Sequence, residues 1–108
     1  MADTDLELLI LEDNQDDREL ILREIQQAGF VPNVRVATDR ASFERALDGD
    51  VPDLVLADYG IPAFPGEESL DVLTQRTDEV PYLVVTGSVG EEKAVELLKL
   101  GATDVIMK

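Results

Sequence analysis

Short, nearly continuous apolar runs alternate along this sequence with longer segments in which apolar residues recur at helical spacing. The apolar runs are Leu6–Leu11, Val34–Ala37, Leu54–Ala57, Tyr82–Val85 and Val105–Met107. Runs without polar alternation are typical of strands buried on both faces, and strands that alternate with helices build a parallel sheet with helices on both sides. We therefore expect an α/β fold in which a helix follows each of the first four strands.

Four segments between these runs predict helices, because apolar residues recur in each at helical spacing, and a capping residue or a glycine marks an end of the first, second and fourth. The predicted helices are a first that ends at Gly29, a second from Asp39 to about Gly49, a third over Glu67–Thr77 and a fourth over Gly90–Leu100, closed by Gly101. The spacing places Leu20, Ile21 and Ile25 of the first helix on one inward face. It places Leu97 and Leu98 of the fourth helix inward as well.

The charge and the missing residue types limit the chemistry open to this chain. It has 24 acidic and 9 basic residues, a formal net charge of −15, and neither histidine nor cysteine. Thiolate and histidine metal sites, disulfides, cysteine nucleophiles and the Ser-His-Asp triad are therefore excluded. The negative charge disfavours direct binding to nucleic acid, because the phosphates would be repelled.

Length and apolar content predict one folded domain over residues 1–108. A chain of 108 residues matches the usual size of a single domain, and its apolar fraction of 44% is enough for a core. No apolar run is long enough to cross a bilayer, and the acidic start is unlike a secretory signal. We expect no membrane association and a cytoplasmic location.

Polar residues that could take part in catalysis or metal binding follow the predicted strands at their carboxyl ends. Glu12 and Asp13 follow the first strand, Asp58 the third, Thr86 the fourth and Lys108 the fifth. The carboxyl ends of parallel strands meet at one edge of a sheet, where such folds form their sites. Each residue alone has an ordinary interpretation as a solvated turn or terminal residue, a strand residue or a helix cap, so only the joint pattern points to a site.

Four segments in this order and spacing resemble the receiver domain of response regulators. They are LLILEDNQDD, LVLADYGIPAFPG, LVVTGS and GATDVIMK, and together they cover essentially the whole chain. The resemblance implies a three-layer sandwich with a five-stranded parallel sheet in the order 2-1-3-4-5. It also implies that Pro62 and Gly66 belong to the turn that follows the third strand.

The resemblance implies a Mg²⁺ site made of oxygen ligands. Asp13 matches the acid that binds the metal directly, and Glu12 matches the neighbouring acid that binds through water. Asp58 and the backbone carbonyl of Gly60 complete the implied ligand set. Mg²⁺ prefers oxygen ligands and keeps several waters, so a few carboxylates and one carbonyl are sufficient.

The resemblance further implies that Asp58 is a phosphoacceptor, with Thr86 and Lys108 contacting the bound phosphoryl group. Because the chain has no histidine, the phosphoryl donor would be a phosphohistidine of a partner, either a sensor histidine kinase or a histidine phosphotransfer protein. We therefore expect a phosphorelay signalling domain of a two-component system, rather than an enzyme.

Two other functions have to be weighed against this one. A receiver-like interaction module that works without phosphorylation is the main alternative, although the intact acid set argues against it. A phosphohydrolase with an aspartyl intermediate is disfavoured, because its second Asp would stand where this chain has Gly60.

The resemblance also predicts a fifth helix after Lys108, which this sequence does not contain, so we expect a chain truncated before that helix. The missing helix would leave an apolar face beside the first helix, and exposed patches of this kind rarely stay bare. We expect a second chain, an exchanged element or a neighbouring molecule in a crystal to cover that face, and a homodimer is one such arrangement. The aromatic residue that the family uses as a switch on the last strand is replaced here by Val105.

Overall fold

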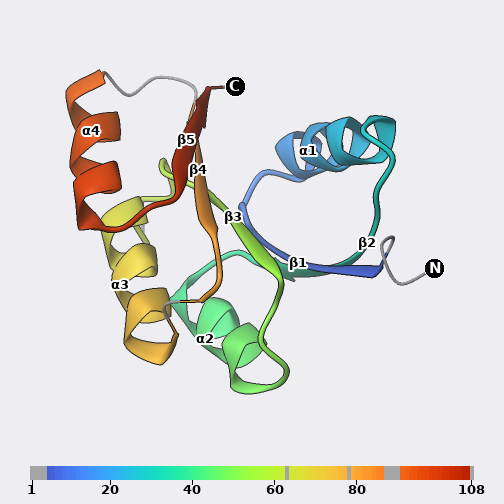
Figure 1. Ribbon diagram of the computed structural model, residues 1–108, viewed down its shortest axis with the longest axis horizontal. Helices are drawn as coiled ribbons and strands as arrows, with labels where there is room; N and C mark the ends of the chain where they lie inside the picture. Colours follow the sequence, from blue (N-terminus) through green and yellow to red (C-terminus); the bar gives the residue numbers. More distant parts are fainter. Residues whose placement is uncertain (1–4, 63, 78, 87–90, 108) are drawn as a thin grey trace.

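The computed structural model describes residues 5–62, 64–77, 79–86 and 91–107. In these residues nine elements alternate along the chain (Figure 1). They are β1 (Asp5–Leu11), α1 (Gln15–Gln27), β2 (Val31–Ala37), α2 (Arg40–Asp48), β3 (Leu54–Asp58), α3 (Gly66–Arg76), β4 (Tyr82–Thr86), α4 (Glu91–Leu100) and β5 (Asp104–Met107). The strands form one five-stranded parallel sheet in the order β2-β1-β3-β4-β5, which confirms the expected fold.

Strand β2 is longer than the sequence predicted, since it begins at Val31 rather than Val34. Pro32 and Asn33 disfavour a strand in isolation. In the fold, β2 is an edge strand that pairs, among the described strands, with β1 alone, and Pro32 stands opposite Leu6. Proline is tolerated on an edge strand, where one side of the backbone needs no partner in the sheet.

Local capping explains where the helices begin and end. The Asp39 side chain accepts a hydrogen bond from Ser42 N at 2.8 Å, and the Ser42 hydroxyl in turn accepts one from Asp39 N at 3.1 Å. This capping box starts α2 at the predicted position. Gly29 and Gly101, which follow α1 and α4, have φ of 98° and 119°, the left-handed conformation that glycine adopts without strain.

The sheet carries a different core on each face. Along β1, Leu9 and Leu11 turn to the side packed by α2, α3 and α4, whereas Leu8 and Ile10 turn to the side of α1. All four side chains are fully buried. The larger core contains the aromatic pair Phe43 and Phe64, whose rings meet edge to face at 5.5 Å. Three of the described helices therefore cover one face, and one covers the other.

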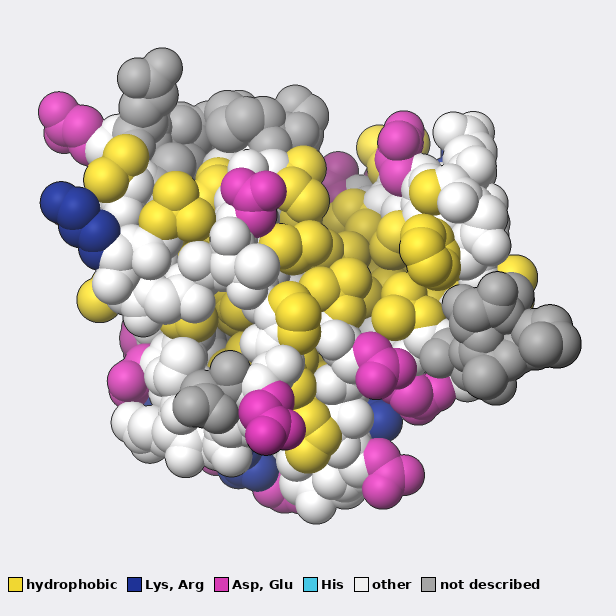
Figure 2. All heavy atoms as spheres, viewed as in Figure 1, with side chains coloured by type: hydrophobic (Ala, Val, Ile, Leu, Met, Phe, Trp, Pro, Cys, Tyr) yellow, Lys and Arg dark blue, Asp and Glu magenta, His cyan; other side chains and the backbone are white. Residues whose placement is uncertain are grey.

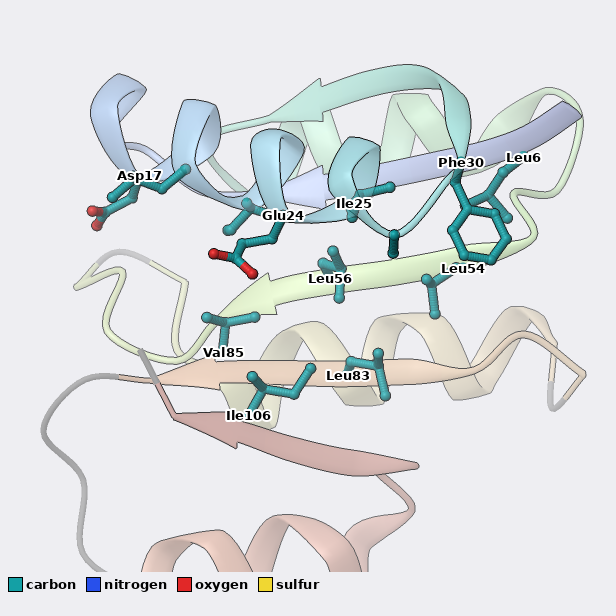
Figure 3. Close-up of a pocket in the computed structure, with 13 residues that line it drawn as sticks. Leu6, Asp17, Glu24, Ile25, Phe30, Leu54, Leu56, Leu83, Val85 and Ile106 are labelled. Atoms are coloured by element: carbon teal, nitrogen blue, oxygen red, sulfur yellow. The ribbon is translucent and has the colours of Figure 1, made fainter. Parts of the chain in front are cut away.

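The face that carries α1 is hollowed by an apolar groove of about 760 Å³. Hydrophobic side chains gather in this hollow between α1 and the strands (Figure 2). The groove is lined by Leu6, Asp17, Leu20, Ile21, Glu24, Ile25, Ala28, Phe30, Leu54, Leu56, Leu83, Val85 and Ile106 (Figure 3). The exposed apolar face expected from the sequence is thus present.

Two side chains predicted to be buried are exposed. All residues of α1 are described, none is buried, and Leu20 is 55% exposed at the rim of the groove. Leu98 of α4 is 43% exposed, while its neighbour Leu97 is fully buried. Helical spacing identifies an apolar stripe, but the packing of the neighbouring elements decides how much of that stripe is covered. None of the helices in the described ranges is long and apolar enough to span a membrane.

Candidate functional site

The register of the sheet brings the predicted site residues to one edge. Leu11, the last residue of β1, pairs with Ala57, and Asp58, the last residue of β3, pairs with Val85. Glu12 and Asp13 directly follow Leu11, so they leave the sheet beside Asp58. Residues from distant parts of the sequence meet here because β1 and β3 are neighbours.

Three carboxylates converge at this edge. One oxygen each from Glu12, Asp13 and Asp58 lies within 4.8 Å of the other two. Asp13 is exposed, Asp58 is half-buried, and Glu12 is only 1% exposed. Such a set of oxygen ligands fits a hard divalent cation.

Backbone hydrogen bonds hold Glu12 in place. Its amide donates to Ala37 O at 3.0 Å, its carbonyl accepts from Arg18 Nη1 at 2.8 Å, and its Oε2 accepts from Asn14 N at 3.2 Å. Asn14 is also the N-cap of α1 and accepts from Asp17 N at 3.0 Å. The acidic pair is therefore positioned by the same short segment that starts the first helix.

The convergence of three acids has an electrostatic consequence. Two carboxylates about 5 Å apart repel each other by roughly 3 kcal/mol at an effective dielectric constant of about 20. A cation bound among the carboxylates offsets this repulsion. The geometry of Glu12, Asp13 and Asp58 therefore favours binding of a divalent cation.

Asp58 is oriented by the turn that follows it. Its Oδ1 accepts a hydrogen bond from Gly60 N at 3.2 Å. A Cβ built on Gly60 would stand 3.7 Å from Oδ1 and 3.8 Å from Oδ2, ordinary contact distances. Glycine is thus not required at this position for space beside the carboxylate. The role of the Gly60 carbonyl as a metal ligand stays a prediction.

The remaining predicted residues lie on β4 and β5. Thr86 is the last residue of β4, is 3% exposed and pairs with Met107 of β5. It stands one position beyond Val85, the partner of Asp58. Lys108, the predicted amine of the site, lies outside the described residues.

A polar cluster beside the acids was not anticipated from the sequence. The Tyr59 hydroxyl donates to Glu67 Oε1 at 2.7 Å, and Lys93 Nζ lies 3.7 Å from the same oxygen. The hydrogen bond to the Glu67 carboxylate, together with burial, raises the pKa of Tyr59. Burial alone would raise the pKa of Glu67, but the hydrogen bond from Tyr59, a backbone hydrogen bond at Glu67 itself and the Lys93 ammonium together lower that pKa. The sequence did contain a hint of this cluster: the hydroxyl of Tyr59 stands next to Asp58, and Glu67 is an acid in the first turn of the following helix.

Comparison with known proteins agrees with this arrangement. The family model described as the response regulator receiver domain matches residues 8–108. The phosphate regulon transcriptional regulatory protein PhoB of Escherichia coli (strain K12) is 32% identical over 103 residues, covering 94% of this chain and 44% of that protein. The chain thus spans less than half the length of this relative.

Solved structures show the same fold. The receiver domain of NtrX from Brucella abortus superposes with a TM-score of 0.83 at 28% identity, covering 94% of this chain and 85% of that one. A response regulator from Burkholderia pseudomallei, solved with a phosphorylated aspartic acid and a calcium ion, has a TM-score of 0.81 at 20% identity, covering 95% and 59%.

The family model matches nearly the whole chain. Receiver domains bind a divalent metal, and this chain has an acidic cluster of Glu12, Asp13 and Asp58. Receiver domains are the signalling modules of two-component systems, rather than classical enzymes, and their partners are histidine kinases. This chain belongs to the response regulator receiver domain family.

Proposed function

We propose that this domain accepts a phosphoryl group on Asp58 from the phosphohistidine of a partner protein. The observation that carries the proposal is the convergence of Glu12, Asp13 and Asp58 within 4.8 Å at the carboxyl edge of the sheet. Such a cluster places a potential nucleophile next to a site for a cation. Phosphoryl transfer to a carboxylate needs both of these components.

Glu12, Asp13, Asp58 and the Gly60 carbonyl would hold Mg²⁺. The ion would neutralise charge on the phosphoryl oxygens when it is bound. The resemblance to the family assigns direct ligation to Asp13 and ligation through water to Glu12. Gly60 N donates a hydrogen bond to Asp58 Oδ1 at 3.2 Å and so helps to orient the carboxylate.

In the proposed transfer a carboxylate oxygen of Asp58 forms a bond to phosphorus. The bond from phosphorus to the imidazole nitrogen of the partner breaks, and its electron pair returns to that ring. The Thr86 hydroxyl and the Lys108 ammonium would then contact two oxygens of the product, since charged and hydroxyl donors form strong bonds to phosphoryl oxygens.

Labelling with acetyl phosphate and Mg²⁺ tests this proposal. The wild type should gain the mass of one phosphoryl group, and Asp58→Asn should gain none. Asp71→Asn, which removes the same charge from an exposed position on α3, is the matched control and should be labelled like the wild type. Full labelling of Asp58→Asn would remove Asp58 from the role. Absence of labelling in the wild type would favour the interaction module that works without phosphorylation.

The donor would be a sensor histidine kinase or a histidine phosphotransfer protein, and both would meet this domain in the cytoplasm. The chain has no histidine of its own, so the phosphohistidine must come from the partner. Relay from a purified kinase that is itself labelled, with transfer lost in Asp58→Asn, would identify the partner.

The apolar groove bears on the oligomeric state. On the α1 face, Leu20 is 55%, Phe30 44% and Ile106 42% exposed, and these side chains flank the groove (Figure 3). We propose that this 108-residue chain pairs with a second copy through this face. Because the chain carries a net charge of −15, added salt should strengthen pairing. A monomer at high concentration and high salt in sedimentation would contradict the dimer.

A further inference from the structure

Tyr59 connects the phosphoacceptor to two helices. It directly follows Asp58, and its amide donates to Val85 O at 3.2 Å, so its backbone is fixed between β3 and β4. Its half-buried ring lies against Gly66, the first residue of α3, so closely that a Cβ built there would come within 2.7 Å of Cδ1. A movement of the backbone at Asp58 therefore displaces a ring in contact with the start of α3.

The hydroxyl end of the same ring extends this contact to α4. Tyr59 Oη donates to Glu67 Oε1 at 2.7 Å, and Lys93 Nζ, in the first turn of α4, lies 3.7 Å from that oxygen. Lys93 is also 3.2 Å from Glu96 Oε2, so one ammonium bridges an acid of α3 and an acid of α4. The side chains of Glu67 and Lys93 are 34% and 50% exposed, so the contact can form and break at low cost.

We propose that Tyr59, Glu67 and Lys93 form a polar link through which changes at Asp58 move the first turn of α4. The inference rests on the proposed phosphoacceptor function. Tyr59 and Lys93 act in it as positioning residues, because neither is placed among the metal ligands. Val105 of β5 is half-buried against the larger core and offers no hydroxyl or charge for such a link.

The test uses beryllofluoride with Mg²⁺, which mimics a phosphoryl group on an aspartate, and follows backbone amides by two-dimensional NMR. In the wild type, the amide of Gly60 should shift and report binding, and the amides of Glu92 to Leu97 should shift with it. In Tyr59→Phe, which keeps the ring and removes only the hydroxyl, the Gly60 shift should remain and the α4 shifts should be lost.

Two further variants separate the steps of the link. Glu67→Gln keeps an acceptor for the Tyr59 hydroxyl but removes the charge that attracts Lys93, so the α4 shifts should also be lost. Lys99→Gln removes the same charge as Lys93→Gln from the last turn of α4 and should respond like the wild type, whereas Lys93→Gln should not.

The outcomes distinguish this inference from the proposed function. Shifts in α4 that persist in Tyr59→Phe, while Gly60 reports binding, would overturn the link and leave the phosphoacceptor intact. A wild type that shows no shift at Gly60 would contradict the phosphoacceptor function, and the link would fall with it.

Discussion

Gly66 lies against the ring of Tyr59 with no room for a side chain, since a Cβ at Gly66 would stand 2.7 Å from Tyr59 Cδ1. Gly66→Ala should therefore destabilise the domain, because either the ring or the start of α3 must move. Overpacking of this kind costs about 1–3 kcal/mol. Chemical denaturation followed by circular dichroism measures the loss.

Gly49→Ala is the matched control for this substitution. Gly49 caps α2 at a φ of −92°, and a Cβ built there meets nothing within 4 Å. Alanine should be tolerated there with little change in the free energy of unfolding. Equal losses in the two alanine variants would show that the contact with Tyr59 is not the cause.

The Tyr82 hydroxyl belongs to a buried polar cluster below α3. Tyr82 is 1% exposed, shares a hydrogen bond with the Ser69 hydroxyl and donates to Gly66 O at 3.2 Å. Burial raises the pKa of Tyr82, so this phenol stays neutral. Tyr82→Phe should lower the free energy of unfolding by about 1 kcal/mol, because the fully buried Ser69 then loses a partner.

A double-mutant cycle with Ser69→Ala checks this contact. The bond between the two hydroxyls is lost in either single variant, so the double variant should be less destabilised than the sum of the singles. Strict additivity in urea denaturation would show that Tyr82 and Ser69 do not interact.

The acid cluster predicts opposite effects of Asp13→Asn with and without metal. In EDTA the variant should melt at a higher temperature than the wild type, because one of three mutually repelling charges is gone. With Mg²⁺ at about ten times its dissociation constant, the wild type should gain about 1.4 kcal/mol. The variant should gain much less, and thermal melts in the two buffers report both effects.

Asp71→Asn on α3 is the control for the metal response. It carries the same change of charge outside the acid cluster, so its gain with Mg²⁺ should equal that of the wild type. A Mg²⁺ response that Asp13→Asn retains in full would contradict the ligand role of Asp13.

The acid cluster could be predicted from the sequence because topology alone creates it. Glu12, Asp13 and Asp58 follow neighbouring parallel strands, and strand order decides their proximity whatever the side-chain details. The link of Tyr59 to Lys93 could not be predicted in this way. It depends on a rotamer and on the packing of α3 against α4, which no local pattern encodes.

Errors in burial and strand length have the same origin. Leu20 has the helical spacing of a core residue, but only the tertiary structure shows that nothing described covers its end of α1. The strand around Pro32 was missed because its backbone preference is overridden by a place at the edge of the sheet. Local sequence specifies which elements form, whereas neighbours decide how far they extend and what they bury.

The capping box of α2 predicts a pH dependence. Asp39 is exposed, and its hydrogen bonds from the Ser42 side chain and backbone lower its pKa below the ordinary value of 3.8. A carboxylate whose pKa is lower in the folded state stabilises the fold above its unfolded pKa, and this contribution is lost as pH falls through the folded pKa. The wild type should therefore exceed Asp39→Asn in stability near neutral pH, and the difference should shrink below about pH 4.

Melting temperatures of both proteins between about pH 7 and about pH 3 measure this difference. Ser42→Ala, which removes the partner and keeps the acid, should weaken the pH dependence as well. A difference that stays constant across the range would show that the charge of Asp39 does not contribute to the cap.

The central strand β1 holds Glu12 and Asp13 at the end of the most buried part of the sheet. Leu8 to Leu11 of β1 are fully buried and are hydrogen-bonded to strands on both sides. Their amides should exchange with deuterium only when the whole domain opens, whereas outer elements open locally. Glu12 and Asp13 directly follow this strand. Local opening of the outer elements should therefore leave these two acids in place, and a cation can bind without the whole domain having to refold.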